Sequence, residues 1–326
     1  TTNLPHIDTD GTLYVTYEDF KARCDGVFDD YIALNAAHIF ATNYMSKTGN
    51  DVEVRATEGK IYHIFKEREY PIYITQNTDW NNATFIIHDE DIEEKSGRFV
   101  DIFNVTSIKS KDTVVIENPT WTIDTTTKKL TEIDSTLATL NAKGYKRYCV
   151  RVENANKINF IRNNNTTGST QRDIFMIDSE GNLLNDVQWD FDELTKVTIN
   201  GIFDEAHFIK NARFVTNAFN DSHELIYSRK YGKPIYMKRG IFFESADNFD
   251  ISNIINAQSE DIMSGSYTGF FNFNYCADVR INDCEVYNRK FTENSGRSTY
   301  AININWSTNL NFYNITTNDI HDNDRW

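Results

Sequence analysis

Cysteine, proline and glycine are scarce in this sequence of 326 residues, which has 4, 4 and 14 of them respectively. The four cysteines show no CxxC spacing, so we expect neither a disulfide framework nor a zinc site. Cys276 and Cys284 are instead expected to be free thiols that serve as small buried apolar residues. Few prolines and glycines, together with abundant Asn, Asp, Ile and Thr, are typical of a protein built from strands and turns.

Long apolar runs and excess positive charge are also lacking. No apolar run approaches 18 residues, and no basic segment followed by an apolar one opens the sequence, so we expect a soluble protein with no membrane partner. The formal net charge of −15 disfavours nucleic acid and anionic membranes as partners, because both attract basic surfaces. This charge suits a neutral, amino-sugar or cation-decorated glycan, and it is equally ordinary for the surface of a soluble protein.

One pattern occurs three times between residues 242 and 318. Each copy has a small or polar turn, then an apolar, a polar and an apolar residue, then a polar pair that ends in Asn or Asp. The first apolar positions are Phe249, Val279 and Leu310, which are 30 and 31 residues apart. Alternation predicts a strand with one buried face, and its return at a period of this size is typical of a solenoid. The recurrent Asn suits a tight bend with a left-handed backbone. The repeat therefore predicts an all-β fold, a parallel β-helix.

The first fifty residues predict one amphipathic helix. Apolar residues recur at steps of three and four from Ile32 to Tyr44, which is the spacing of one helix face. Asp29 or Asp30 can cap its start, and Gly49 can end it. We expect the helix to span about residues 30 to 47 and to cap the first coil.

Most of the remaining sequence is interpreted as further coils. Alternating segments at residues 52–64, 99–123, 148–161, 173–178 and 197–215 are expected to be coil strands. Residues 124–144 break this rhythm and are expected to form a polar loop with one short helical turn that projects from the solenoid. The predicted domains are thus an N-terminal lead with its capping helix, residues 1–50, and a parallel β-helix with inserted loops, residues 51–326. Because no capping segment follows the last copy, we expect the sequence to be a fragment or a processed product.

Two groups of motifs resemble a known superfamily. Cys24-Asp25-Gly26-Val27 followed by Asp29-Asp30 and an apolar helix resembles the opening of the pectate-lyase-like superfamily of right-handed β-helices, where Gly is usual at the position of Cys24. Asn82 likewise replaces a Gly of the superfamily, which Asn can do at a left-handed turn. The sequence from about residue 148 onwards is similar to tailspike and pre-neck appendage proteins of phages that infect low-GC Gram-positive bacteria. The stretches that carry this similarity are residues 151–161, 189–192, 239–241, 264–270 and 317–322.

The resemblance implies a single-stranded right-handed parallel β-helix and a role at the host surface. Its members bind and degrade wall teichoic acid or a capsular polysaccharide during adsorption. They assemble as homotrimers in the virion, as tail appendages beside other tail proteins. We expect the same partners and location for this protein.

Carboxylates that follow the last three coils are the predicted catalytic groups. Glycan cleavage commonly needs one protonated and one ionised carboxyl group, and neighbouring coils bring polar residues to about 4.8 Å. No cofactor is expected, and a divalent cation held by paired Asp residues and His321 is the alternative. The predicted catalytic residues are Glu260, Asp261, Asp322 and Asp324, and the predicted substrate-binding residues are Arg239, Tyr267, Arg289, Lys290, His321 and Arg325. Aromatic residues that either stack on sugars or pack internally are Trp189, Tyr267, Phe270, Phe271 and Trp306.

Three hypotheses about function remain open from the sequence. The first is a phage depolymerase, a hydrolase with a lyase not excluded, and the second is a non-catalytic receptor-binding module for the same polymer. The third is a cellular pectinase-like enzyme. GxSxG, HExxH and phosphate-binding glycine motifs are missing, so serine hydrolase, zincin and nucleotide-binding functions are not pursued.

Overall fold

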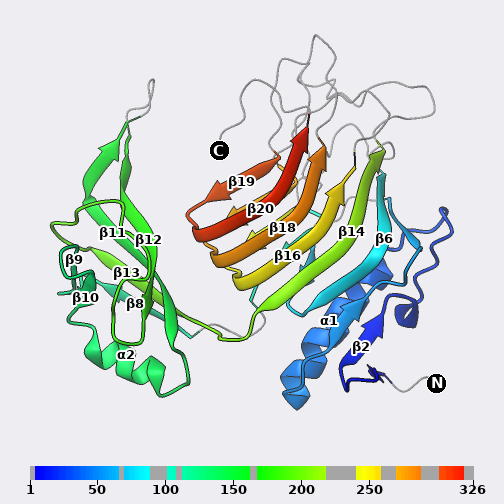
Figure 1. Cartoon of the computed structure of the whole chain (residues 1–326), viewed down its shortest axis with the longest axis horizontal. Helices are drawn as coiled ribbons and strands as arrows, with labels where there is room; N and C mark the ends of the chain where they lie inside the picture. The colour runs from blue at the N-terminus through cyan, green and yellow to red at the C-terminus, as the bar shows by residue number, and fades with distance from the viewer. Residues whose placement is uncertain are drawn as a thin grey trace, which may run out of the picture.

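The computed structural model describes residues 4–65, 70–88, 101–107, 112–161, 167–217, 240–257, 269–287 and 301–318, and most of its regular structure is strand. Two stacked sheets of parallel strands form the larger part of the molecule (Figure 1). The first sheet runs in the order β2 (Leu13–Thr16), β3 (Glu53–Arg55), β6 (Thr78–His88), β14 (His207–Asn217), β16 (Asp247–Asn256), β18 (Ala277–Tyr287) and β20 (Thr308–Asn318). The second runs β5 (Ile72–Ile74), β7 (Phe103–Val105), β15 (Ile241–Glu244), β17 (Phe271–Asn274) and β19 (Ile302–Asn305). β1 (His6–Ile7) pairs antiparallel with β2, and β4 (Ile61–Ile64) pairs parallel with β6.

The predicted repeat is confirmed as parallel strands in register. Phe249 is opposite Val279, and Val279 is opposite Leu310. The chain alternates between the two sheets from β15 to β20, so each strand lies beside the one that precedes it by about thirty residues. Phe249 and Val279 are completely buried, which identifies their face of the strand as the inner one.

Asparagine and aspartate hold the bends of this stack in left-handed backbone conformations, as predicted. The φ angles of Asn253, Asp283 and Asn314 are 52°, 53° and 51°, and that of Asn82 is 58°. The Asn253 amide donates to the side-chain oxygens of Asn211 (2.9 Å) and Asn82 (3.1 Å), and the Asn314 amide donates to Asp283 (2.6 Å). The bends of successive turns are therefore linked by side-chain hydrogen bonds.

The N-terminal helix has the predicted extent. α1 spans Tyr31–Thr48, and Gly49, with a φ of 75°, ends it by donating its N–H to the Met45 carbonyl. A short 3₁₀ helix, η1 (Glu18–Phe20), packs beside it. α1 lies against β2, β3 and β5, so it covers the first turns of the stack (Figure 1).

Of the two expected caps, Asp29 accepts the N–H of Tyr31, the first residue of α1 (3.1 Å), whereas Asp30 differs from that role. It occupies the N-cap position, but its carboxylate makes no capping hydrogen bond and is almost completely buried. It accepts the backbone N–H groups of Arg23 (2.7 Å) and His63 (2.9 Å) instead. The motif thus fastens the N-terminal lead to β4. Cys24 has a φ of 54°, in the region that favours the Gly usual at this position of the superfamily motif.

Residues 113–202 differ most from the expectation, because they form an antiparallel module rather than coils. β8 (Thr113–Glu117), β11 (Arg147–Phe160), β12 (Ser169–Asp178) and β13 (Lys196–Ile202) make one sheet in the order β12-β11-β13-β8, with every pair antiparallel. β9 (Thr122–Asp124) and β10 (Lys129–Thr131) form a hairpin, and α2 (Asp134–Asn141) is the predicted helical turn. Alternating apolar residues mark a half-buried strand of either orientation, so periodicity did not reveal the pairing.

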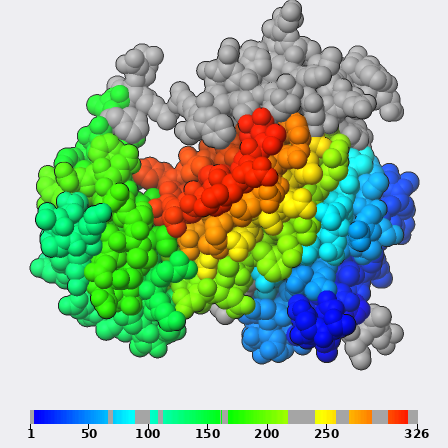
Figure 2. All heavy atoms as spheres, in the orientation of Figure 1, coloured from blue at the N-terminus to red at the C-terminus, as the bar shows by residue number. Residues whose placement is uncertain are grey.

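The module is an insertion that leaves the stack continuous. β6 pairs directly with β14, and Thr78 is opposite Ile209. One face of the module's sheet and α2 share one apolar cluster, which includes Val150, Phe175 and Val197 from the sheet and Leu137 from α2. The other face is directed toward the stack, which it abuts beside β18 and β20 (Figure 2).

All four cysteines are free thiols, and Cys276 and Cys284 are buried, as predicted. Among the described residues, no helix is long and apolar enough to cross a membrane.

A buried polar chain in the N-terminal core makes stability depend on pH. Trp80 Nε1 donates to the Tyr17 hydroxyl (2.8 Å), which is also hydrogen-bonded to His38 Nε2 (3.0 Å). Complete burial disfavours the charged imidazolium and lowers the pKa of His38 to about 3, so the imidazole is neutral near neutral pH.

We predict that His38 makes the protein less stable as the pH falls below about 6.5, the pKa of an unfolded histidine. Its contribution is fully present above that pH and is lost at roughly 1.4 kcal/mol per pH unit down to about pH 3. Urea unfolding between pH 7 and pH 4 measures this loss. His38→Gln keeps an acceptor but does not titrate, so its curve should fall less steeply; parallel curves would contradict the assignment.

We also predict that Asn253→Ala lowers the free energy of unfolding by about 1–2 kcal/mol, because Ala pays the steric cost of a left-handed backbone. Asn253→Gly loses the same hydrogen bonds without that cost and should be the milder change. Urea denaturation of both variants separates the two effects. A glycine variant as unstable as the alanine variant would show that the side-chain bonds, not the backbone, set the cost.

Candidate functional site

All ten residues predicted for the site lie outside the described residues. They are Glu260, Asp261, Asp322, Asp324, Arg239, Tyr267, Arg289, Lys290, His321 and Arg325. The strands that precede three of these segments are in register, with Asn256 opposite Val286 and Val286 opposite Thr317. The carboxyl ends of β16, β18 and β20 therefore lie on the same side of the sheet. The ten site residues themselves remain a prediction.

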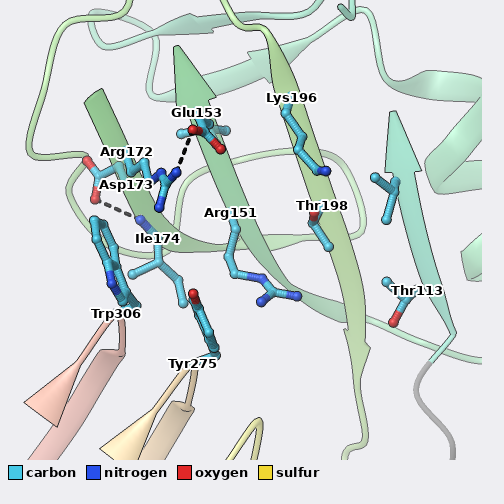
Figure 3. A pocket seen from close by; sticks show the side chains of 12 residues that line it. Thr113, Arg151, Glu153, Arg172, Asp173, Ile174, Lys196, Thr198, Tyr275 and Trp306 are labelled. Atoms are coloured by element: carbon cyan, nitrogen blue, oxygen red, sulfur yellow. Dashed lines mark hydrogen bonds and ion pairs between the residues drawn. The ribbon is translucent and has the colours of Figure 1, made fainter. Parts of the chain in front are cut away.

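The described residues form a different candidate site, a cleft of about 400 Å³ between the inserted sheet and the end of the stack (Figure 3). β8, β11, β12 and β13 form one wall, and the turns before β18 and β20 form the other. The lining residues are Thr113, Val115, Arg151, Val152, Glu153, Arg172, Asp173, Ile174, Lys196, Thr198, Tyr275 and Trp306.

Antiparallel register arranges the polar wall in rows across the sheet. Glu153 is opposite Arg172 on one side and Lys196 on the other, and Lys196 is opposite Glu117. Charges of opposite sign therefore alternate along this row. Two ion pairs result: Arg172 with Glu153 (2.7 Å) and Lys196 with Glu117 (2.8 Å).

Arg151 lies in the next row and has a different environment. Its neighbours across the sheet are Ile174 and Thr198, neither of which is charged. Among the described residues no carboxylate pairs with it, and its buried Nε has no hydrogen-bond partner. The Arg151 guanidinium is therefore a positive charge that the described cleft does not neutralise.

Two aromatic side chains form the opposite wall. Tyr275 and Trp306 occupy equivalent positions of successive repeats, and Ser245 is the equivalent residue of the preceding one. Their φ angles are 55° and 45°, a left-handed conformation that is uncommon for bulky residues and costs about 1–2 kcal/mol. Ser245 shares this conformation, with a φ of 52°, so the left-handed backbone belongs to this turn of the repeat. Trp306 is 41% exposed, so its apolar face is available to a ligand.

Each aromatic ring is matched by an arginine from the inserted sheet. The Arg151 guanidinium lies 4.7 Å from the centre of the Tyr275 ring, and that of Arg172 lies 5.7 Å from the Trp306 ring. Figure 3 shows both arginines on strands of the inserted sheet, with the Arg172–Glu153 ion pair as a dashed line. These cation–π contacts connect the two walls of the cleft.

Asp173 is a carboxylate of the cleft with a perturbed proton affinity. Burial raises its pKa, although backbone N–H groups oppose the shift. Its oxygens accept the N–H groups of Gln188 (2.5 Å) and Ile174 (2.8 Å). Asp173 is therefore engaged in fastening the segment after β12 to the sheet.

Hydrogen bonds and an ion pair near the cleft connect the inserted module to the stack. Arg147 pairs with Asp278 (2.5 Å), and the Asn185 amide donates to the Thr308 hydroxyl (2.8 Å). The Asn248 amide donates to the carbonyl of Phe203 (2.8 Å). The module meets the stack through these bonds and a small apolar cluster of Cys149, Ile174, Met176, Ile202 and Ala277.

The aromatic residues named from the sequence fall into two groups. Phe270 and Phe271 are buried and pack against other rings, so the internal interpretation is correct for them. Trp306 faces the cleft, and Trp189 is 39% exposed outside the lining. Tyr275 and the cleft arginines were not predicted. An alignment of the repeats would have placed Tyr275 and Trp306 at equivalent positions of neighbouring turns. No signal in the sequence pointed to Arg151 or Arg172.

No metal centre is formed by the described residues, which contain no group of three or more His, Cys, Asp or Glu side chains able to hold an ion. The alternative with His321 and its neighbouring Asp residues lies outside that part of the chain.

No protein-family model and no curated protein matches the sequence. Among solved structures, the tailspike gp61 of Pseudomonas phage phi297 is similar with a TM-score of 0.51 and 11% identity, over 94% of this chain and 48% of that chain. PfbA, a surface adhesin of Streptococcus pneumoniae, has a TM-score of 0.43 and 10% identity, over 93% of this chain and 48% of that one. The chain thus spans about half the length of each protein. At such identity the similarity to the tailspike concerns the fold, a β-rich, tailspike-like architecture.

Proposed function

We propose that this protein binds a bacterial cell-surface polymer in the cleft between the inserted sheet and the stack. The observation that carries the proposal is the pair Tyr275 and Trp306, two aromatic residues that form one wall of a polar cleft. Aromatic faces stack on sugar rings, and the polar wall offers hydrogen bonds to their hydroxyl groups. A cleft with both features suits a glycan chain.

The proposal includes a place and an architecture. The strands paired in register and the tailspike-like fold support a single-stranded right-handed parallel β-helix of the pectate-lyase-like kind. We place the protein on a phage virion as a tail appendage, as a homotrimer at full length and beside other tail proteins. The polymer would be wall teichoic acid or capsular polysaccharide of a Gram-positive host. A cellular pectinase-like enzyme is the less favoured alternative.

Degradation of the polymer is a second candidate function. Because β16, β18 and β20 end in register, the segments that follow them start at one edge of the sheet. Carboxylates on those segments, Glu260, Asp261, Asp322 and Asp324, are our candidates for hydrolysis. The described cleft is less suited to cleavage, because Asp173 is engaged with backbone groups and Glu153 with Arg172. A non-catalytic receptor-binding module is the alternative.

Removing either cleft aromatic should weaken polymer binding about tenfold, because each loses a stacking surface. The variants are Trp306→Ala and Tyr275→Ala. Titration calorimetry with purified Gram-positive wall polymers measures the effect, and circular dichroism checks the fold. Tyr313→Ala is the matched control, since Tyr313 is 57% exposed on β20 but does not line the cleft. Wild-type affinity in all three variants would refute binding in this cleft.

If the protein also cleaves the polymer, Asp261→Asn or Asp322→Asn should lower the rate at least about a hundredfold, the usual worth of a positioned acid or base. Binding should persist, because both variants leave the described lining residues of the cleft unchanged. The chain length of the polymer over time is the measurement. A polymer that wild-type protein binds but never shortens would establish the non-catalytic alternative, and full activity in both variants would move the catalytic site elsewhere.

A further inference from the structure

We infer that Arg151 binds an acidic group of the polymer, either a sugar carboxylate or a phosphodiester, and so makes the cleft selective for acidic over neutral chains. The inference rests on the proposed binding function and adds the chemical class of the ligand.

Arg151 differs from the other basic side chains of the cleft, which form ion pairs with carboxylates. Arg172 and Lys196 each have a carboxylate partner at 2.8 Å or less, so their charges are largely balanced within the sheet. Arg151 has no such partner among the described residues, although the protein carries 48 acidic residues. A guanidinium left without a carboxylate on a protein this acidic favours a ligand that supplies the negative charge.

The hydrogen bonding of Arg151 is also incomplete. Its Nε is buried and donates to no acceptor, whereas buried donors in folded proteins almost always find one. Ile174 on one side offers no acceptor side chain, and Thr198 on the other makes no hydrogen bond to it. The terminal nitrogens of the guanidinium are not among the buried unpaired atoms, so an incoming oxyanion can accept from their N–H groups.

The geometry prepares Arg151 for such a ligand. The ring of Tyr275 packs against the guanidinium at 4.7 Å and restricts its orientation. Figure 3 shows Arg151 in the middle of the cleft, between Tyr275 and Thr198. A planar guanidinium held this way presents paired N–H donors, which match the two oxygens of a carboxylate or a phosphodiester. A sugar ring could then stack on Trp306 while its acidic group reaches Arg151.

The test compares Arg151→Gln with Arg213→Gln, using poly(glycerol phosphate) teichoic acid, polygalacturonate and neutral dextran as probes. Arg213 is an exposed residue of β14 outside the cleft, so both variants lose one positive charge. Arg151→Gln should weaken binding of one acidic polymer on the order of tenfold to a hundredfold, the worth of a charge-assisted hydrogen bond, and leave dextran unchanged. Arg213→Gln should change neither. Loss with the teichoic acid identifies a phosphodiester ligand, and loss with polygalacturonate a carboxylate.

Several results would overturn the inference. The first is that Arg151→Gln and Arg213→Gln bind both acidic polymers with equal affinity. The second is that Arg151→Gln loses as much affinity for dextran as for an acidic polymer, which indicates a structural role. The third is that the wild-type protein binds neither acidic polymer. Trp306→Ala distinguishes a failure of this inference from a failure of the proposed function. If it weakens binding of purified wall polymer while Arg151→Gln does not, the cleft binds glycans without charge selection. If neither variant changes that binding, the cleft is not the binding site.

Discussion

In-register pairing of parallel strands about thirty residues apart is the constraint on which the rest of the structure depends. Because Phe249, Val279 and Leu310 are opposite one another, every other equivalent position of the repeats must also lie side by side. Left-handed Asn and Asp residues thereby form hydrogen-bonded rows, and Tyr275 and Trp306 come to lie on neighbouring turns. The same constraint that buries the core thus places two aromatic rings along one wall of the cleft.

The inserted module provides the other wall without disturbing the stack. β6 and β14 are paired directly, although more than a hundred residues separate them in the sequence. Closing a loop of this length costs only slightly more than closing a short one, because the entropic cost rises with the logarithm of length. A module with its own apolar cluster around α2 can therefore fold beside the stack and present its polar face to the ends of β18 and β20.

The sequence was informative where the structure is local or periodic. The helix to Thr48, the register of Phe249 with Val279, and the left-handed Asn253 all follow from spacing and residue chemistry. Orientation in residues 113–202 could not be predicted, because a half-buried strand alternates in the same way whether its partner is parallel or antiparallel. The cleft depends on that orientation, since Arg151, Arg172 and Lys196 come together only through antiparallel pairing. Trp306 was named among aromatic residues that either stack on sugars or pack internally, and nothing local in the sequence marks Arg151 as unpaired.

A crystal structure of the protein with an oligosaccharide released from the polymer it binds best tests the placement of the site most directly. Binding in the cleft predicts sugar rings against Tyr275 and Trp306 and an acidic group within hydrogen-bonding distance of the Arg151 guanidinium. A saccharide bound elsewhere on the molecule, with Arg151 still stacked on Tyr275 and no ligand beside it, would contradict the assignment.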